Sequence, residues 1–431
     1  MFTSFKELQK EINFTMKSEI NLGLERMRRF LEKVGNPQNQ IKIVHIGGTN
    51  GKGSTLRFLE SILQEAGHHV GTFHSPSYEY INDQISVNGA YITDRELMKI
   101  IKIFNEKGLD EAGLTEFELQ TAMAYYYFAF MKKVDFALIE VGLGGREDST
   151  NVIKPVLSII TNVGYDHIGF LGTTIKEIAA HKAGIIKKGI PVICGEQKAE
   201  AKEVIKAEAK TIDSPISFME EDFSYSLVDR EQEGETFSFH SKEKLISDIR
   251  ISMQGEHQVA NASLAIKAYL TLTEKGLARY EENILKRGLL KATHPGRFEV
   301  VSRNPLIIMD GAHNDEAMDA LVRSMEMCYS NRKVIVLFSA LIDKPIESMV
   351  KKLEKLASEI IFTSFHFPRA ARAENIYHIS HHPNKQVEEE WEIALNAAVS
   401  RLDEESVLLV TGSLYFISET RSYLTRRKDK V

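Results

Sequence analysis

Short β-branched segments alternate with longer amphipathic segments along most of this chain, and this alternation constrains the fold more than any other feature. From Ile41 onward, apolar runs of strand length are separated by stretches with helical periodicity. Strands that alternate with helices form mostly parallel sheets covered by helices on both faces. In the first part of the chain we expect strands at 41–46, 70–73, 136–141, 156–161 and 191–194, and helices at 53–66, 116–132 and 174–187.

The alternation is interrupted once and then resumes. Between 214 and 251, short alternating segments with charged turns predict an antiparallel appendage. Thr293-His294-Pro295-Gly296 has the composition of a linker, and a second α/β series follows it. We therefore expect an α/β protein of two domains. Residues 1–293 form an N-terminal domain with a P-loop-type, mostly parallel sheet and a small antiparallel appendage, 294–297 form a hinge linker, and 298–431 form a smaller α/β domain.

Composition excludes several classes of protein. The 431 residues include 54 Lys and Arg against 60 Asp and Glu, so the net charge of −6 offers no basic excess for binding nucleic acid. The apolar runs are shorter than the roughly 20 residues of a membrane span, and residues 1–7 do not resemble a secretion signal. Only Cys194 and Cys328 are present, which indicates a reducing compartment. We expect a cytoplasmic protein without nucleic-acid or membrane partners.

The segment Gly47-Gly48-Thr49-Asn50-Gly51-Lys52-Gly53-Ser54-Thr55 lies between an expected strand and an expected helix. Glycines there let backbone N–H groups approach phosphate oxygens, and the helix N-terminus favours negative charge. The spacing departs from G-x-x-x-x-G-K-[ST], because Ile46 replaces the first glycine and Gly53 separates Lys52 from Ser54. The motif predicts a phosphate-binding loop, and the alternative is a glycine-rich turn with an exposed lysine.

Five further segments carry polar residues at expected strand ends or on a nearby helix. Glu140 ends a strand before a glycine-rich stretch, where a carboxylate can hold Mg²⁺ or simply meet solvent. His167 follows the next strand, and the alternative is a hydrogen-bonded structural histidine. Lys182 lies on a helix, where the default is an exposed lysine. Asp310 and His313 follow a strand of the second series, where they can face a cleft or belong to a turn formed by Asp-Gly. Residues 411–415 follow the last strand and carry hydroxyl groups.

Taken together, these motifs resemble the folylpolyglutamate synthase and dihydrofolate synthase family of Mur-ligase-like, ATP-dependent amide ligases. Residues 48–54 resemble its G-T-N-G-K-G-S, and residues 140–151 resemble its E-x-G-x-G-G-x-x-D-x-T-N. Six further matches occur in the family's order, at 115–118, 181–187, 255–262, 295–299, 310–314 and 411–415. The resemblance covers roughly residues 40 to 420.

The resemblance implies roles for individual residues. ATP phosphates would contact Asn50, Gly51, Lys52, Gly53 and Ser54, and the nucleotide would also contact Asn261, Arg297 and Asp310. Magnesium, with two sites expected, would bind Ser75, Glu140 and His167. Lys182 matches a lysine that is carbamylated in the family. Asp148 would contact substrate, while His313 and Ser413 would lie near the incoming L-glutamate. The catalytic residues implied are Lys52, Lys182 and His313.

The implied reaction adds L-glutamate to folates, and dihydropteroate is an open alternative acceptor. ATP would convert the acceptor carboxylate to an acyl phosphate, which the amine of glutamate then attacks. Closure of the two domains would exclude water. Two positions depart from the family pattern, Gln84 in place of an arginine and His294 in place of a tryptophan.

Two other functions stay open from the sequence. One is a Mur-type amide ligase that acts on another carboxylate substrate. The other is a nucleotide-gated binding protein without catalysis, which Glu140, His167 and Lys182 together argue against because nucleotide binding alone does not need them. We expect a monomer whose partners are the small molecules folate, L-glutamate and ATP.

Overall fold

The computed structural model describes residues 22–77, 80–231, 234–242 and 244–428. Its chain divides into two compact units. The first comprises Met1–Val228, Thr236–Ile251 and Val259–Ala292, and the second Asp229–Glu235, Ser252–Gln258 and Thr293–Val431. Residues 1–7, for which we excluded a secretion signal, lie outside the described residues. The domain limits drawn from the sequence stay a prediction.

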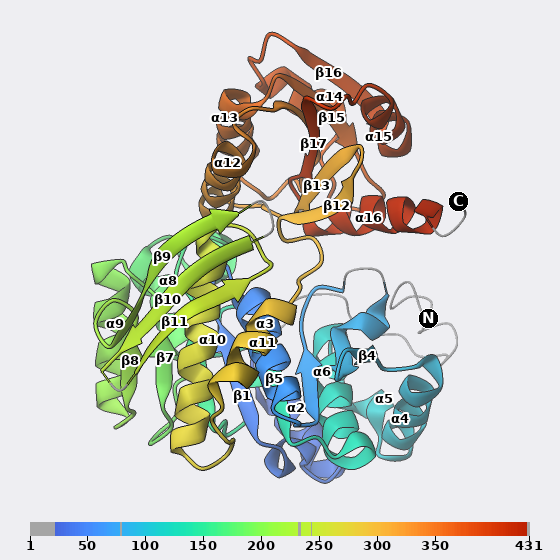
Figure 1. Cartoon of the computed structure of the whole chain (residues 1–431). Helices are drawn as coiled ribbons and strands as arrows, with labels where there is room; N and C mark the ends of the chain where they lie inside the picture. Colours follow the sequence, from blue (N-terminus) through green and yellow to red (C-terminus); the bar gives the residue numbers. More distant parts are fainter. Residues whose placement is uncertain (1–21, 78–79, 232–233, 243, 429–431) are drawn as a thin grey trace. The chain divides into compact units, whose positions relative to one another are not determined.

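An eight-stranded, mostly parallel sheet forms the centre of the first unit (Figure 1). Strands β2, β5, β1, β6, β7 and β8 run parallel, and β3 and β4 add an antiparallel edge. In spatial order the strands are β4 (Ala90–Tyr91), β3 (Ile85–Val87), β2 (Val70–Phe73), β5 (Phe136–Glu140), β1 (Ile43–Gly47), β6 (Leu157–Ile160), β7 (Val192–Cys194) and β8 (Ile216–Phe218).

Helices of this unit bury apolar side chains of the sheet. One core places Phe30, Phe104 and Tyr125 against sheet residues such as Phe73 and Ile139. The helices are α2 (Glu25–Lys33), α3 (Lys52–Glu65), α4 (Asp94–Glu106), α5 (Leu109–Ala112), α6 (Glu116–Tyr126), α7 (Ile168–Leu171), α8 (Ile175–Ala183), α9 (Ala199–Thr211), α10 (Glu256–Glu274) and α11 (Glu282–Lys291). Short 3₁₀ segments are η1 (Pro37–Gln40), η2 (Ile81–Gln84) and η4 (Ser149–Asn151), and η3 (Tyr127–Lys132) is a π-helical continuation of α6.

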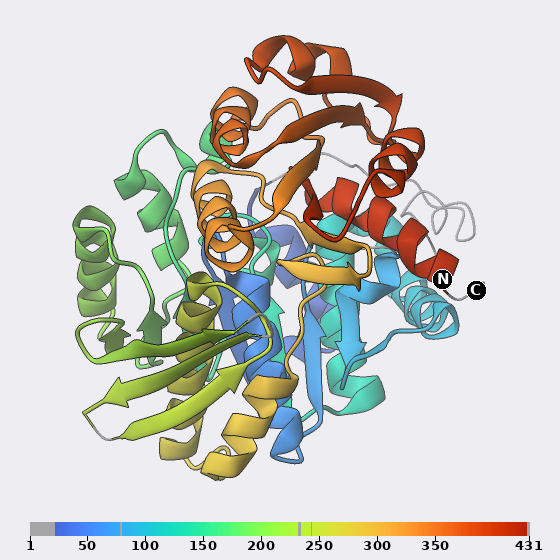
Figure 2. The ribbon, with the colours of Figure 1, turned by 45° about the horizontal axis from the view of Figure 1, so that its top comes forward.

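A separate three-stranded sheet consists of β9 (Phe223–Glu231), β10 (Gly234–Ser241) and β11 (Leu245–Ile251) in the order β11-β10-β9 (Figures 1 and 2). The few residues between consecutive strands are too short for a parallel crossover, so the strands are antiparallel. The predicted appendage therefore exists, but its predicted start near residue 214 is wrong. Residues 216–218 instead pair parallel to β7 as β8 and extend the main sheet.

The second unit contains a six-stranded sheet with the order β12-β13-β17-β14-β15-β16. Only the β12–β13 pair is antiparallel. Its strands are β12 (Glu299–Arg303), β13 (Leu306–Asp310), β14 (Lys333–Phe338), β15 (Glu359–Ser364), β16 (Lys385–Glu390) and β17 (Ser406–Thr411), and its helices are α12 (Asp315–Tyr329), α13 (Ile346–Leu356), α14 (Ala373–Ile379), α15 (Trp391–Ser400) and α16 (Leu414–Lys428). Separate cores fill its two faces, so the predicted two-part α/β fold class is confirmed.

Local sequence explains where α6 and α8 of the first unit begin, and local hydrogen bonds show where α8 ends. The Thr115-x-x-Glu118 segment is a capping box, because the Thr115 N–H donates to Glu118 Oε2 at 2.8 Å and Thr115 Oγ1 accepts the Glu118 N–H. A similar box at Thr174 starts α8. The predicted extension of α8 to residue 187 is wrong. The helix ends at Ala183, because the N–H groups of 184–186 donate three residues back, not four, and tighten the last turn.

Within the described residues, no helix combines the length and the apolar character that a membrane span needs.

Candidate functional site

Four neighbouring parallel strands of the first unit end at one edge of the sheet, which we call the carboxyl edge. In spatial order they are β2, β5, β1 and β6. Ser75 follows β2, Glu140 ends β5, residues 47–54 follow β1, and residues 161–167 follow β6. The parallel sheet thus brings together predicted phosphate and magnesium residues that lie far apart in sequence, at the edge where α/β proteins bind ligands.

The segment 47–54, which we call the phosphate loop, needs glycine at two positions. Gly48 has a φ of +147° and Gly51 a φ of +81°. A Cβ atom at Gly48 would overlap Thr161 Oγ1, and one at Gly51 would overlap Asn261 Oδ1. The predicted nucleotide residue Asn261, on α10, therefore lies directly against the loop.

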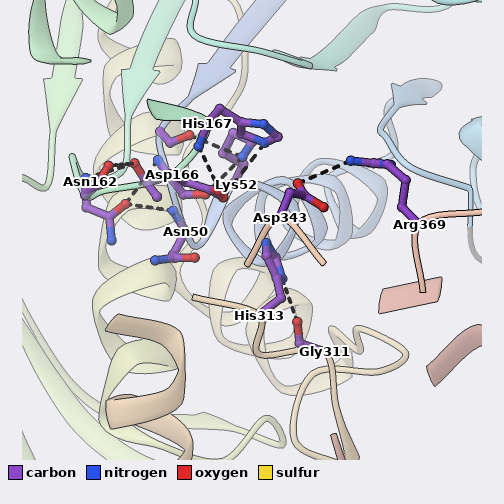
Figure 3. A network of polar contacts seen from close by, with 12 residues as sticks. Asn50, Lys52, Asn162, Asp166, His167, Gly311, His313, Asp343 and Arg369 are labelled. Carbon is purple, nitrogen blue, oxygen red and sulfur yellow. Dashed lines mark hydrogen bonds and ion pairs between the residues drawn. The ribbon is translucent and has the colours of Figure 1, made fainter. Parts of the chain in front are cut away.

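Asn162 ties part of the phosphate loop to β6. Its Oδ1 atom accepts the backbone N–H groups of Thr49 at 3.2 Å and Asn50 at 2.8 Å (Figure 3). Thr161 Oγ1 donates to Asn50 O at 2.6 Å. Gly164 and Thr49 exchange two hydrogen bonds at 2.9 and 3.2 Å. The residues 161–164 therefore hold the loop rigidly beside the start of α3.

The next backbone N–H groups remain available for an anion. Among the described residues, none accepts the N–H of Gly51, Lys52 or Gly53, whereas the Thr55 N–H is already bonded to Gly51 O at 2.9 Å. These groups open α3, whose N-terminus carries a partial positive charge. Ser54 follows in the first turn and is buried. The arrangement is that of an anion-binding helix N-terminus.

Lys52 lies folded over this loop. Its Nζ atom donates to Gly48 O at 3.2 Å and Thr49 O at 3.1 Å, and it lies 3.7 Å from Glu140 Oε1. The lysine thereby connects the phosphate loop with the end of β5. Its flexible side chain can turn toward a phosphate oxygen without leaving the site.

Two of the three predicted magnesium ligands suit that ion. Glu140 is a buried carboxylate and Ser75 a hydroxyl, the oxygen donors that Mg²⁺ prefers, whereas imidazole is an unusual partner. His167 is 42% exposed, and its Nε2 atom lies 3.9 Å from Asp166 Oδ2. No group of three or more His, Cys, Asp or Glu in the described part of the chain has a metal-binding arrangement. The donor types fit magnesium with water completing the shell, and the ligand set stays a prediction.

Residues 142–151, which we call the glycine-rich loop, pack against α8. The Arg146 N–H donates to His181 O at 2.8 Å, and Asn151 Nδ2 donates to Gly184 O at 3.1 Å. A Cβ atom at Gly145 would lie 3.2 Å from Lys182 O. Lys182 itself is 3% exposed, so the structure excludes the exposed lysine that was the alternative from sequence.

Asp148 organises the interior of the glycine-rich loop. Its Oδ2 atom accepts the Leu143 N–H at 2.7 Å, and its Oδ1 atom accepts the Thr150 N–H at 3.0 Å and the Thr150 hydroxyl. Burial raises the pKa of Asp148, while these hydrogen bonds act in the opposite direction. Its carboxylate therefore shapes the loop, and its predicted contact with substrate stays a prediction.

In the second unit, Asp310 lies at the end of β13 beside the end of β17. Its carboxylate accepts the N–H groups of Phe298 and Ala312, both at 2.8 Å. Burial raises its pKa, and the positive charge of Arg297 opposes this shift. Among the described residues, none forms a hydrogen bond or ion pair with the Arg297 guanidinium. A cation thus acts on a buried carboxylate here, and the contacts of both residues with a nucleotide stay a prediction.

His313 and Ser413 belong to the same sheet edge of this unit. The His313 Nδ1 atom lies 2.8 Å from Gly311 O (Figure 3), which fixes the ring at that nitrogen. Asp310 pairs in register with Thr411, and buried Ser413 follows two residues later. Two further buried hydroxyls, Ser339 Oγ and Thr411 Oγ1, have no hydrogen-bond partner among the described residues. From the sequence alone we predicted no individual role for Ser339 or Thr411.

Sequence reasoning also missed Asn162, His45 and Thr150. Asn162 precedes His167 in the segment after an expected strand, and its position directly after that strand was the available signal. His45 is a polar residue in an otherwise apolar strand, which was a signal for a buried contact. Thr150 lies two residues after Asp148 in the motif at residues 140–151.

The sequence matches two Mur ligase families. Residues 46–269 match the Mur ligase middle domain, and residues 296–414 match the Mur ligase glutamate ligase domain. The Bacillus subtilis dihydrofolate synthase/folylpolyglutamate synthase is 42% identical over 98% of this chain and 100% of its own length. The Lacticaseibacillus casei folylpolyglutamate synthase is 34% identical over 94% of this chain and 95% of its own.

Solved structures resemble the whole chain as well. Escherichia coli FolC in complex with DHPP and ADP superposes with a TM-score of 0.89 at 27% identity and covers 98% of both chains. The folylpolyglutamate synthase of Thermotoga maritima has a TM-score of 0.84 at 33% identity, covering 98% of this chain and 96% of its own. Both similarities therefore extend over nearly the whole of this chain.

Proposed function

Because this chain belongs to the folylpolyglutamate synthase and dihydrofolate synthase family of Mur ligases, we propose that it is an ATP-dependent ligase that adds L-glutamate to folates. The observation that carries this proposal is the carboxyl edge of the first unit, where the phosphate loop and Lys52 adjoin Glu140. The relatives support it, since the Bacillus subtilis protein is named for both activities and the Lacticaseibacillus casei protein for folylpolyglutamate synthase.

ATP phosphates would bind at the start of α3. The N–H groups of Gly51, Lys52 and Gly53 and the hydroxyl of Ser54 would hold phosphate oxygens, with Asn50 and Asn261 beside them. Lys52 would turn from its carbonyl contacts toward the phosphoryl group in transfer. Its charge, with that of Arg297, would stabilise the negative charge that develops there.

The chemistry follows from the weakness of a carboxylate as an acyl donor. Transfer of the γ-phosphoryl group to the folate carboxylate gives an acyl phosphate with a good leaving group. The amine of L-glutamate then attacks the carbonyl carbon, phosphate departs, and an amide remains. An acyl phosphate hydrolyses when water reaches it, so we infer that the residues of 294–297 act as a hinge between domains 1–293 and 298–431.

L-Glutamate would bind at the carboxyl edge of the second unit. His313 and Ser413 belong to that edge, and the partnerless hydroxyls of Ser339 and Thr411 supply unused donors close to Ser413. A buried polar group without a partner is costly, so a ligand carboxylate would relieve that cost. Asp310 and Arg297 would contact the nucleotide.

Magnesium would be held by Ser75, Glu140 and His167 beside the phosphate loop, and a second ion near Lys182 is part of the proposal. The ion would offset phosphate charge during phosphoryl transfer. Lys182 would carry a carbamate, formed when its neutral amine attacks CO₂ and releases a proton. Burial of Lys182 supports this, because removal from water disfavours a charged ammonium, and a carbamate can be held by a cation.

The acceptor remains the least constrained part of the proposal. Gln84 replaces an arginine of the family pattern, and its buried Oε1 atom has no hydrogen-bond partner among the described residues. His294, in place of a tryptophan, is buried in the linker segment. We propose that the protein uses dihydropteroate as well as reduced folates, acts as a cytoplasmic monomer, and has folate, L-glutamate and ATP as its partners.

The direct test incubates the protein with ATP, Mg²⁺ and labelled L-glutamate, with dihydropteroate in one reaction and a reduced folate monoglutamate in another. Label in either product supports the ligase. Label in neither, with ATP still bound, favours a non-catalytic nucleotide-binding protein. ATP consumption with a different carboxylate acceptor favours another Mur-type ligase. Lys52→Ala provides the inactive control.

A further inference from the structure

His45 is a fully buried histidine that the proposed reaction does not use. It lies in β1, two residues before the phosphate loop begins, and pairs in register with Ile139 of β5 and Ser158 of β6. Its side chain has no exposed surface. A polar ring in the central strand of a buried sheet needs a reason, because burial of a polar group without a partner costs stability.

One ring nitrogen of His45 has a partner on the glycine-rich loop. Its Nε2 atom lies 2.9 Å from Thr150 Oγ1. The Thr150 main chain is held from another element as well, since the Tyr125 hydroxyl of α6 donates to Thr150 O at 2.8 Å. The core of the unit therefore fixes Thr150 through its side chain and its carbonyl.

A count of protons decides the direction of the His45 contact. The Thr150 hydroxyl has one proton, and it donates that proton to Asp148 Oδ1. Burial raises the pKa of Asp148, but its carboxylate also accepts the N–H groups of Thr150 and Leu143, and these two hydrogen bonds favour its charged form. Thr150 Oγ1 must then accept from His45, so the His45 proton resides on Nε2.

The other ring nitrogen agrees with this assignment. No described residue forms a hydrogen bond with His45 Nδ1. With the proton on Nε2, Nδ1 is a bare acceptor, and an unsatisfied buried acceptor is better tolerated than an unsatisfied buried N–H. Burial and the charge of Lys187 lower the pKa of His45 to about 3, which keeps the ring neutral.

We propose that His45 is a positioning residue for the acceptor substrate, whose Nε2–H orients the Thr150 hydroxyl toward Asp148 and so fixes the glycine-rich loop. The chain of contacts runs from the central strand through Thr150 to the carboxylate that shapes residues 142–151. The link to the acceptor rests on the proposed function and on the predicted contact of Asp148 with substrate. The direction of the hydrogen bonds does not rest on it.

The kinetic test compares variants that keep or remove each donor. His45→Leu and Thr150→Val remove the contact with little change of shape, whereas His45→Gln and Thr150→Ser keep a donor or hydroxyl. We expect the KM for the acceptor to rise about tenfold or more in the first pair, because Asp148 loses an oriented donor. The KM for ATP stays within about twofold, and the second pair recovers most of the loss.

Two comparisons separate positioning from simple loss of stability. The double variant His45→Leu with Thr150→Val is expected to be no worse than either single variant, because both act through one chain of contacts. Ser158→Ala is the matched control, since it removes a buried hydrogen bond to Ile185 O from the strand position that pairs with His45. It should lower thermal stability and leave the acceptor KM unchanged.

A spectroscopic measurement tests the proton assignment independently of activity. Nitrogen NMR of the protein labelled at histidine should show a signal that is lost in His45→Gln and therefore belongs to His45. That ring should be protonated at Nε2, bare at Nδ1, and should not titrate near pH 6.5. A ring protonated at Nδ1 would overturn the proposal. An acceptor KM that is the same in His45→Leu as in an active wild-type protein would also overturn the proposal. If the wild-type protein transfers labelled glutamate to no acceptor, the proposed function is wrong. The NMR measurement then still tests the direction of the His45 hydrogen bond.

Discussion

The side-chain oxygen of Asn162 accepts the backbone N–H of Asn50 at 2.8 Å and thereby ties the end of β6 to the phosphate loop. Asn162→Ala removes this hydrogen bond and the one from Thr49. Since each is worth about 1 kcal/mol, nucleotide affinity should fall by about tenfold to a hundredfold, with little change in the KM for glutamate. Calorimetric titration with ADP measures the effect.

Asn396→Ala is the control for that variant, because it removes an asparagine side-chain hydrogen bond to Tyr423 from the second unit. ADP affinity should be unchanged in it. Equal affinities of Asn162→Ala and wild type for ADP would show that the loop keeps its shape without Asn162.

Gly51 and Gly67 allow a closely matched test of the phosphate loop. Their φ angles are +81° and +83°, but a Cβ at Gly51 would overlap Asn261, whereas a Cβ at Gly67 meets nothing within 4 Å. Both alanine variants bear the backbone cost of roughly 1–2 kcal/mol. Only Gly51→Ala should also lose ADP binding, by more than about tenfold. Thermal unfolding of both variants measures the shared backbone cost, and ADP titration measures the effect of the Cβ overlap with Asn261. Similar ADP affinities in the two variants would contradict a role for that overlap in nucleotide binding.

Much of the candidate site could be anticipated because strand ends are local features. Alternation of strands and helices placed Glu140 and Asp310 at strand termini, and the structure ends β5 and β13 at those residues. Parallel pairing then brings such termini to one edge without further information. The fold class followed from the same pattern.

Contacts between distant segments could not be anticipated in this way. Asn162 and Asn50 are 112 positions apart, and nothing in either local sequence specifies that an amide oxygen fills the space beside that loop. Likewise, β8 has only three residues, so its alternation cannot distinguish an added parallel strand from the first strand of an antiparallel sheet. The early end of α8 reflects the packing of Gly184, where a Cβ would overlap Arg146, and no periodicity records that neighbour.

Buried histidines should make the first unit sensitive to acid. The pKa of His45 is lowered to about 3 by burial and then by Lys187, and that of His74 to about 3 by burial and then by Arg57. Below pH 6.5 the unfolded chain binds protons at these residues and the folded chain does not. The free energy of unfolding should therefore fall as pH falls, by up to about 1.4 kcal/mol per pH unit for each histidine.

His45→Gln isolates one of these contributions. Its unfolding free energy should decline less steeply below pH 6.5 than that of the wild type, by up to about 1.4 kcal/mol per unit. Denaturant unfolding at a series of pH values measures both slopes. Parallel curves for the two proteins would mean that His45 is protonated in the folded state as readily as in the unfolded one.

Lys182 provides the sharpest test of the proposed second metal site. If it carries a carbamate, the intact mass of protein kept under bicarbonate and Mg²⁺ should exceed the sequence mass by one CO₂, and acidification should remove the excess. Lys182→Arg cannot form the carbamate, because a guanidinium stays protonated, and it should lack both the added mass and most ligase activity. Lys176→Ala, which removes an exposed lysine of the same helix, should retain both. Full turnover by Lys182→Arg would exclude a carbamate from the reaction, since a permanent cation cannot replace an anion that holds a metal.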